Sequence, residues 1–172
     1  GLWFFLIKED QNDYLKLLVF SKTEGFRHSS IEEGQKMLQN LADQNGFEVL
    51  FSEEAEVFNE KILADVNVIV FLNTTGDILD EAQQLELQRF IQAGGGFVGI
   101  HSATDTEYKW PYYNQLIGAY FDSHPEPAEA TVEVLNRDHL STRHLPQKWV
   151  HTDEWYNFID VHPDINVLME VN

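Results

Sequence analysis

The chain has 172 residues, 43% of them hydrophobic, and its 11 basic against 29 acidic side chains give a formal net charge of −18. This balance argues against nucleic acid and anionic membrane surfaces as partners, because both attract clustered positive charge. The sequence contains no cysteine, which excludes disulfides, thiol catalysis and cysteine-ligated metal sites.

Residues 1–14 are interpreted as an N-terminal extension, and residues 15–172 as one domain that we expect to continue beyond Asn172. The apolar segment 1–7 is too short to span a bilayer. It fits either the remnant of a signal peptide, which would imply export, or an edge strand. No other segment is apolar for long enough to predict a membrane span.

A buried strand is predicted at 15–20, followed by a polar loop and a helix. Ser30 and Glu33 fit a capping box at the start of that helix, which Gly46 ends. Glycine inside a helix costs about 1 kcal/mol relative to alanine. Gly34 therefore predicts a close approach of this helix to the sheet.

The alternation continues with strands at 47–51 and 66–72 and a helix at 81–93, which Asp80 and Gln83 are expected to cap. Glycines 94–96 then lead into the short apolar run 97–100. We interpret that run as a strand buried on both faces of a parallel sheet. Strands that alternate with helices predict βαβ units, with helices on both faces of the sheet.

Polar segments follow three of these strands, after Phe20, Leu72 and Ile100. Parallel strands end at the same edge of their sheet, and open α/β sheets bind ligands outside that edge. The sequence therefore predicts a crevice there.

The last third of the sequence has a different pattern. Pro111 begins a short aromatic helix that Gly118 closes, and the alternating run 130–135 predicts a half-buried, antiparallel strand. An aromatic and acidic segment at 149–158 and a last strand at 165–171 complete this part, which we expect to add strands to the parallel sheet.

His101 and Asp105 are the candidate catalytic residues, because both follow the strand at 97–100. An imidazole with an ordinary pKa of about 6.5 can act as acid or base near neutrality. Asp105 is close enough in sequence to orient it. Ser102 lacks the Gly-x-Ser-x-Gly setting of a nucleophilic serine, so we assign it to substrate binding instead.

Further polar and aromatic side chains are candidates for binding the hydroxyls and faces of a sugar. Capping of strand ends is the alternative role for the polar ones, and core packing for the aromatic ones. Asp153 and Glu154 are adjacent, so at most one of them faces a site on an extended chain. With Ser102, the substrate-binding set is His28, Asn73, Thr74, Trp110, Tyr112, His124 and Glu154.

A metal site is the alternative use of the histidines. His28, His101 and His124 with one water molecule would make an open zinc site. The spacing lacks a helical His-Glu-x-x-His signature, so hydrogen-bonding histidines are preferred and no cofactor is expected.

Several collinear segments resemble the ThuA-like, or trehalose utilisation, family. The resemblance extends from about Leu17 to the end of the chain. It rests on residues 18–31, 71–77, 94–105, 110–124 and 152–156.

The resemblance implies a flavodoxin-like sheet of the kind found in class I glutamine amidotransferases. Those enzymes hold a cysteine nucleophile at the elbow after a strand, and here His101 stands in that place, within Gly99-Ile100-His101-Ser102-Ala103. Amidotransferase activity is therefore not expected. The family is associated with sugar utilisation, often beside further domains.

Three functions follow as hypotheses. The first is an enzyme acting on a sugar or an oxidised sugar, with His101 as acid or base and Asp105 as its orienter. The second is a non-catalytic sugar-binding module of a larger protein, and the third is a histidine-ligated, metal-dependent hydrolase. In each case the expected partner is a small-molecule carbohydrate or a related substrate.

Overall fold

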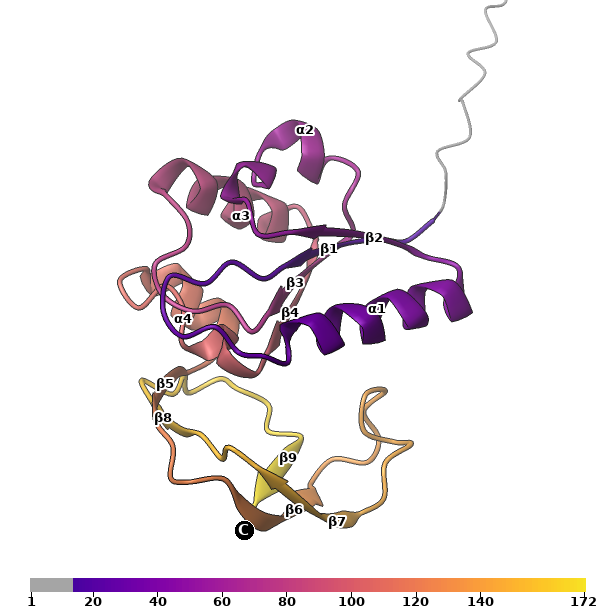
Figure 1. The fold of residues 1–172 in the computed structure, drawn as a ribbon, viewed down its shortest axis with the longest axis vertical. Coiled ribbons are helices and arrows are strands. Elements are labelled where there is room, and N and C mark those ends of the chain that lie inside the picture. Colours follow the sequence, from indigo (N-terminus) through magenta and orange to yellow (C-terminus); the bar gives the residue numbers. More distant parts are fainter. Residues whose placement is uncertain (1–13) are drawn as a thin grey trace, which may run out of the picture.

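The computed structural model describes residues 14–172, so the alternatives for segment 1–7 lie outside the described residues. Its centre is a parallel sheet of four strands, β1 (Lys16–Phe20), β2 (Glu48–Ser52), β3 (Val68–Leu72) and β4 (Gly96–Ile100). The strand order is β2-β1-β3-β4 (Figure 1). The predicted parallel sheet is confirmed.

Helices cover both faces of this sheet. Figure 1 shows α1 (Ile31–Asn45) on one side, and α2 (Glu60–Leu63) and α3 (Glu81–Gln92) on the other. The shorter α4 (Pro111–Ile117) packs on the α3 side, where its Tyr113 joins the same core cluster. Within residues 14–172, no helix combines the length and the hydropathy that crossing a bilayer requires.

Alternate side chains of the strands supply two cores. Leu18 and Phe71 belong to the cluster on the α3 side, whereas Val19 and Leu72 pack with Leu38 of α1. The prediction that strand 97–100 is buried on both faces is wrong. Val98 is 45% exposed, because β4 lies at the edge of the described sheet.

The ends of the helices agree with the sequence in part. Asp80 and Gln83 form the predicted capping box of α3. The box predicted for Ser30 and Glu33 is wrong, because the Ser30 side chain makes no cap hydrogen bond and accepts one from Asn73 instead. A long-range contact has displaced the local one.

Gly34 lies where α1 meets the end of β3. A Cβ atom at this position would stand 2.8 Å from Leu72 Cδ1, so the predicted close approach is confirmed. Gly46 ends α1 in the left-handed conformation, also as predicted.

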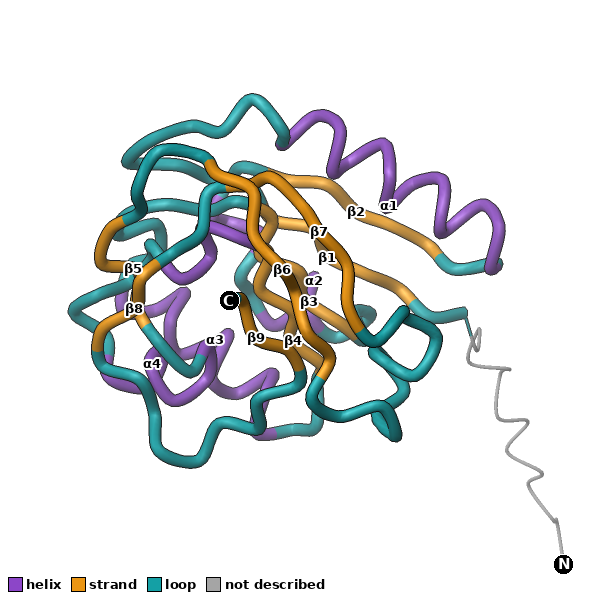
Figure 2. Tube along the Cα trace, turned by 90° about the horizontal axis from the view of Figure 1, so that it is seen from below, coloured by secondary structure: helices purple, strands orange, loops and turns teal. Residues whose placement is uncertain are grey.

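The C-terminal part adds antiparallel strands. β5 (Tyr120–Ser123) pairs with β8 (Asn157–Ile159), and β6 (Ala128–Val134) lies between its two partner strands. Figure 2 shows this second layer, viewed from its own side of the molecule. The strand predicted at 165–171 shortens to its last three residues. The partners of β6 are β7 (Lys148–Asp153) and β9 (Met169–Val171), and two 3₁₀ turns complete the fold, η1 (Ala55–Val57) and η2 (His101–Thr104).

Candidate functional site

The loops that leave β1, β3 and β4 are bonded to one another. The Glu24 amide donates to the Thr75 carbonyl at 2.8 Å, and the Gly76 amide donates to the Asp105 carbonyl at the same distance. The predicted common edge of the sheet is therefore confirmed, and these hydrogen bonds fix the loops that form it.

His101 occupies a sharp turn at the end of β4. Its φ of +52° lies in the left-handed region, which costs a residue with a side chain about 1–3 kcal/mol. The turn is tight, because a Cβ atom on Gly99 would overlap Ile117 and press on Ala103. This geometry resembles a nucleophile elbow, in which one side chain is held out at the top of the sheet.

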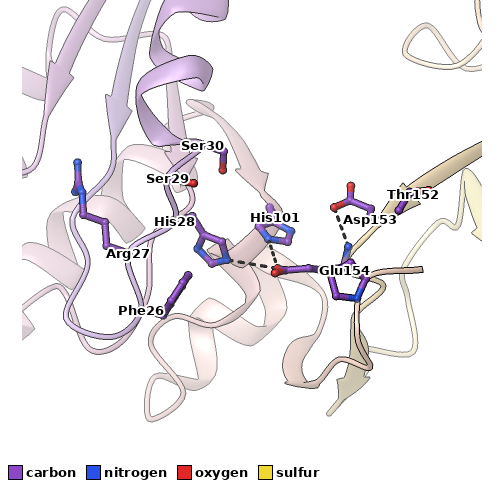
Figure 3. A pocket seen from close by; sticks show the side chains of 10 residues that line it. Phe26, Arg27, His28, Ser29, Ser30, His101, Thr152, Asp153 and Glu154 are labelled. Atoms are coloured by element: carbon purple, nitrogen blue, oxygen red, sulfur yellow. Dashed lines mark hydrogen bonds and ion pairs between the residues drawn. The ribbon is translucent and has the colours of Figure 1, made fainter. Parts of the chain in front are cut away.

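Two histidines and one carboxylate converge beside this turn. Glu154 Oε2 lies 3.3 Å from His101 Nε2 and 3.7 Å from His28 Nε2. One ligand atom from each residue falls within 4.8 Å of the other two. Figure 3 shows both imidazoles directed at the Glu154 carboxylate. His28, His101 and Glu154 are called the central cluster below.

Tyr156 and Ser102 surround the central cluster. The Tyr156 hydroxyl lies 3.1 Å from His101 Nε2 and 3.5 Å from His28 Nε2. On the other side, Ser102 Oγ lies 3.3 Å from His28 Nδ1. Both nitrogens of the His28 ring thus have polar neighbours, and each neighbour restricts the rotation of the ring.

Burial affects the ionisation of His28 and Tyr156. It lowers the pKa of His28, and the nearby His101 lowers it further, while Glu154 opposes both effects. Burial, together with Glu154 and two aspartates, raises the pKa of Tyr156 to about 12. The phenol therefore keeps its proton near neutral pH and can donate a hydrogen bond.

A pocket of about 430 Å³ opens beside the central cluster. Arg27 contributes the only Lys or Arg side chain among the residues that line this pocket. Its guanidinium makes two 2.9 Å bonds to Glu53, and Figure 3 shows it directed away from the histidines. The lining consists of Phe26, Arg27, His28, Ser29, Ser30, His101, Pro127, Thr152, Asp153 and Glu154.

Other predicted site residues lie at the sheet edge but bond elsewhere. The Asp105 carboxylate accepts from the Tyr108 hydroxyl at 2.7 Å, so the carboxylate against His101 is that of Glu154. Asn73 donates to Ser30 at 2.8 Å. Thr74 is fully buried and shares a hydrogen bond with Thr106.

The other predicted site residues lie outside the central cluster. The rings of Trp110 and Tyr112 are tilted against each other with centroids 5.5 Å apart, and Trp110 packs against the hydrophobic core. His124 is exposed, and its Nδ1 lies 2.8 Å from the Pro125 carbonyl. The three-histidine site is therefore not formed, and Glu154 takes the place expected for His124.

Two aromatic residues at the site were not predicted. Tyr156 contacts both histidines, and Phe26 lines the pocket with 69% of its surface exposed. The spacing Glu154-x-Tyr156 was the available signal, because alternate residues of an extended segment share one face. Phe26 belongs to the loop after β1. His28 was predicted as a site residue from its place in this loop, but no pattern in the sequence marked Phe26.

The central cluster has two chemical capacities. A carboxylate against an imidazole can accept and return a proton, as general acid–base catalysis requires. Two imidazoles with one carboxylate are also the protein ligands of many open metal sites. Both capacities need substrate access, which the adjoining pocket supplies.

Comparison with known proteins gives a family and two similar folds. The model of the family ThuA, described as trehalose utilisation, matches residues 16–172. A ThuA-like protein from Bacteroides uniformis ATCC 8492 aligns with a TM-score of 0.79 and 24% identity, over 92% of this chain and 68% of that one. A second ThuA-like structure, from Parabacteroides merdae ATCC 43184, has a TM-score of 0.74 and 19% identity over the same shares. No curated protein matches.

Proposed function

The chain belongs to the ThuA family, and on that premise we propose that it is an enzyme acting on a sugar or an oxidised sugar derivative. The substrate would lie in the pocket beside the central cluster. The observation that carries this proposal is the convergence of His28, His101 and Glu154 from distant segments at the mouth of that pocket.

The lining of the pocket supports a neutral, hydroxylated substrate. Its one guanidinium is paired with Glu53, so the lining residues include no unpaired Lys or Arg side chain for a phosphate or a carboxylate. The serine hydroxyls of residues 29 and 30 and the Thr152 hydroxyl suit sugar hydroxyls. Phe26 offers an exposed aromatic face at the rim, of the kind that apolar faces of small ligands contact.

His101 is the residue around which we expect the reaction to take place. Glu154 and Tyr156 both contact its Nε2, so the ring is held at the pocket and can exchange a proton with a bound hydroxyl. The Asp105 carboxylate contacts the Tyr108 hydroxyl and would help to position the loop after the elbow. Asn73 and Thr74 would brace the same edge through their hydrogen bonds, in place of binding the sugar directly.

Replacement of His101 tests this assignment. His101→Ala should lower turnover of the sugar substrate by about 10²–10⁴, the usual contribution of a general acid or base. His139→Ala is the matched control, since His139 is exposed and its Nδ1 contacts only the neighbouring Ser141 side chain and backbone. Turnover should be measured on disaccharides and their keto forms, beside a thermal melt of each variant.

The outcomes separate this proposal from its competitor. Saturable sugar binding by calorimetry with no product after long incubation would indicate a non-catalytic binding module. Full turnover by a folded His101→Ala variant would remove His101 from the reaction.

A further inference from the structure

The central cluster has the spacing of metal ligands. Zinc bonds of about 2.0–2.2 Å to nitrogen and oxygen place tetrahedral ligands about 3.4 Å apart. Glu154 Oε2 lies at 3.3 Å and 3.7 Å from the two Nε2 atoms, and all three ligand atoms fit within 4.8 Å. The three side chains come from the exit of β1, the elbow after β4 and the segment after β7, so no local sequence pattern produces this arrangement.

The surroundings prepare one imidazole as a ligand. An Nδ1–H of His28 that donates to Ser102 Oγ, 3.3 Å away, leaves the Nε2 lone pair facing Glu154. Histidines that bind metals nearly always donate their other N–H to a neighbouring acceptor in this way. Ser102 is fully buried, so its hydroxyl is held in place by the fold.

The local charge also suits a cation. The pocket lining includes two carboxylates, those of Asp153 and Glu154, and the Glu154 carboxylate lies against both histidines. Arg27, the one guanidinium among the pocket residues, is paired with Glu53 and Glu32. The negative charge beside the histidines therefore has no fixed positive partner among the pocket residues.

We propose that His28, His101 and Glu154 bind one zinc-class divalent metal ion, leaving at least one coordination position open towards the pocket. This inference rests on the proposed function for its substrate, but not for its geometry. With a metal bound, His101 Nε2 would serve as a ligand, and the ion would lower the pKa of a water on the open position, so that the resulting hydroxide could take the role of base in place of His101. The Tyr156 hydroxyl would then lie within reach of that water or of a substrate oxygen.

Metal titration of the whole chain is the test. Protein stripped with a chelator is titrated with zinc chloride by calorimetry, and with cobalt chloride by visible absorption, which reports the coordination number. We expect one site per chain. Because the loss of an outer hydrogen bond alone weakens metal binding about 10–100-fold, His28→Ala, His101→Ala and Glu154→Gln should each weaken it at least about 100-fold.

Two variants serve as controls. His124→Ala should leave the affinity unchanged, although His124 lies beside Tyr156 with ring centroids 5.7 Å apart. His151→Ala removes an exposed histidine that lies 3.7 Å from Asp153 and should also have no effect. If one of the three cluster variants fails to fold, the zinc affinities of the other two test the proposed site. Absence of binding, or binding that survives all three cluster substitutions, would overturn the inference.

Sugar assays on the same samples separate this inference from the proposed function. Zinc binding at the cluster without sugar binding or turnover supports the metal site and contradicts the proposed function. Turnover by stripped protein that binds no metal supports the proposed function and contradicts the metal site. Turnover that disappears on stripping and returns with zinc supports the metal site and an enzyme acting on sugars, with the metal-bound water in the acid–base role that was assigned to His101.

Discussion

At the scale of single residues, the site depends on side chains that hold other side chains. Ser102 immediately follows His101, yet its hydroxyl contacts His28, 74 positions away in the sequence. It therefore couples the loop after β1 to the elbow after β4. We regard Ser102 as a positioning residue, because it is fully buried and is not one of the residues that line the pocket.

Ser102→Ala tests this role. The variant should bind zinc about 10–100-fold more weakly than the parent, as expected when a ligand loses its outer hydrogen bond. The ¹⁵N signals of the His28 ring should also shift, because the polar partner of its Nδ1 is gone. Ser29→Ala, which removes an exposed hydroxyl from the same pocket, is the control. Unchanged affinity and an unchanged His28 signal would show that the 3.3 Å contact has no positioning role.

At the scale of elements, the position of His28 depends on how α1 docks. The helix begins three residues after His28, and Gly34 in its first turns lies against Leu72 at the end of β3. Any shift of the helix at this point moves the loop that holds the histidine. The absence of a side chain at position 34 therefore helps to position His28.

Gly34→Ala should destabilise the protein by about 1 kcal/mol. Alanine favours the helix by up to about 1 kcal/mol, but forcing a methyl group into a packed contact costs about 1–3 kcal/mol. The added Cβ would stand 2.8 Å from Leu72 Cδ1. Chemical denaturation measures the change. Asn40→Ala, on an exposed position of the same helix, should be neutral or slightly stabilising; equal gains in both variants would mean that α1 does not dock closely here.

Predictability differs between the elements for a physical reason. The parallel strands and their helices were predictable, because burial gives β1 and β3 continuous apolar runs. The same logic placed His28 and His101 at one edge. Glu154 was predicted only as one sugar-binding candidate, because it follows an antiparallel strand whose position depends on tertiary contacts. The Ser30 cap failed for the same reason, as Asn73 takes that hydroxyl from 43 positions away.

At the scale of the whole molecule, the site joins two layers. The parallel sheet supplies His28 and His101, and the C-terminal layer supplies Glu154 and Tyr156. Neither layer by itself contains all three residues of the central cluster. A buried acid, Glu107, helps to hold the edge of the sheet where these layers meet. Its carboxylate accepts from the Ile78 and Leu79 amides at 2.8 Å and from the Gln84 side chain at 2.6 Å.

The stability of the fold should depend on pH through Glu107. Burial raises its pKa in the folded protein above the ordinary value of 4.5, outweighing the hydrogen bonds that lower it. A raised pKa means that the folded state holds the proton more tightly than the unfolded state does. The contribution of Glu107 to stability is therefore present below pH 4.5 and lost as the pH rises through the raised pKa.

Glu107→Gln isolates this effect. Glutamine keeps the oxygen that accepts the two amides, and Gln84 can present its own oxygen to the new amide group. The difference in free energy of unfolding, variant minus parent, should increase from pH 4.5 upward in denaturant titrations. A difference that stays flat, or that falls with pH, would show that the Glu107 carboxyl ionises in the folded protein as readily as in water.

Imidazole ¹⁵N spectroscopy of the chelator-treated full chain tests whether His28, His101 and Glu154 meet, without a substrate or a metal. At one fixed pH, Glu154→Gln should shift the ring signals of both His28 and His101, since one carboxylate oxygen lies within 3.7 Å of both rings. The signals of His139, His144 and His162 should not move. Unchanged signals from His28 and His101 would contradict this arrangement, because Glu154 would then not lie between the two rings.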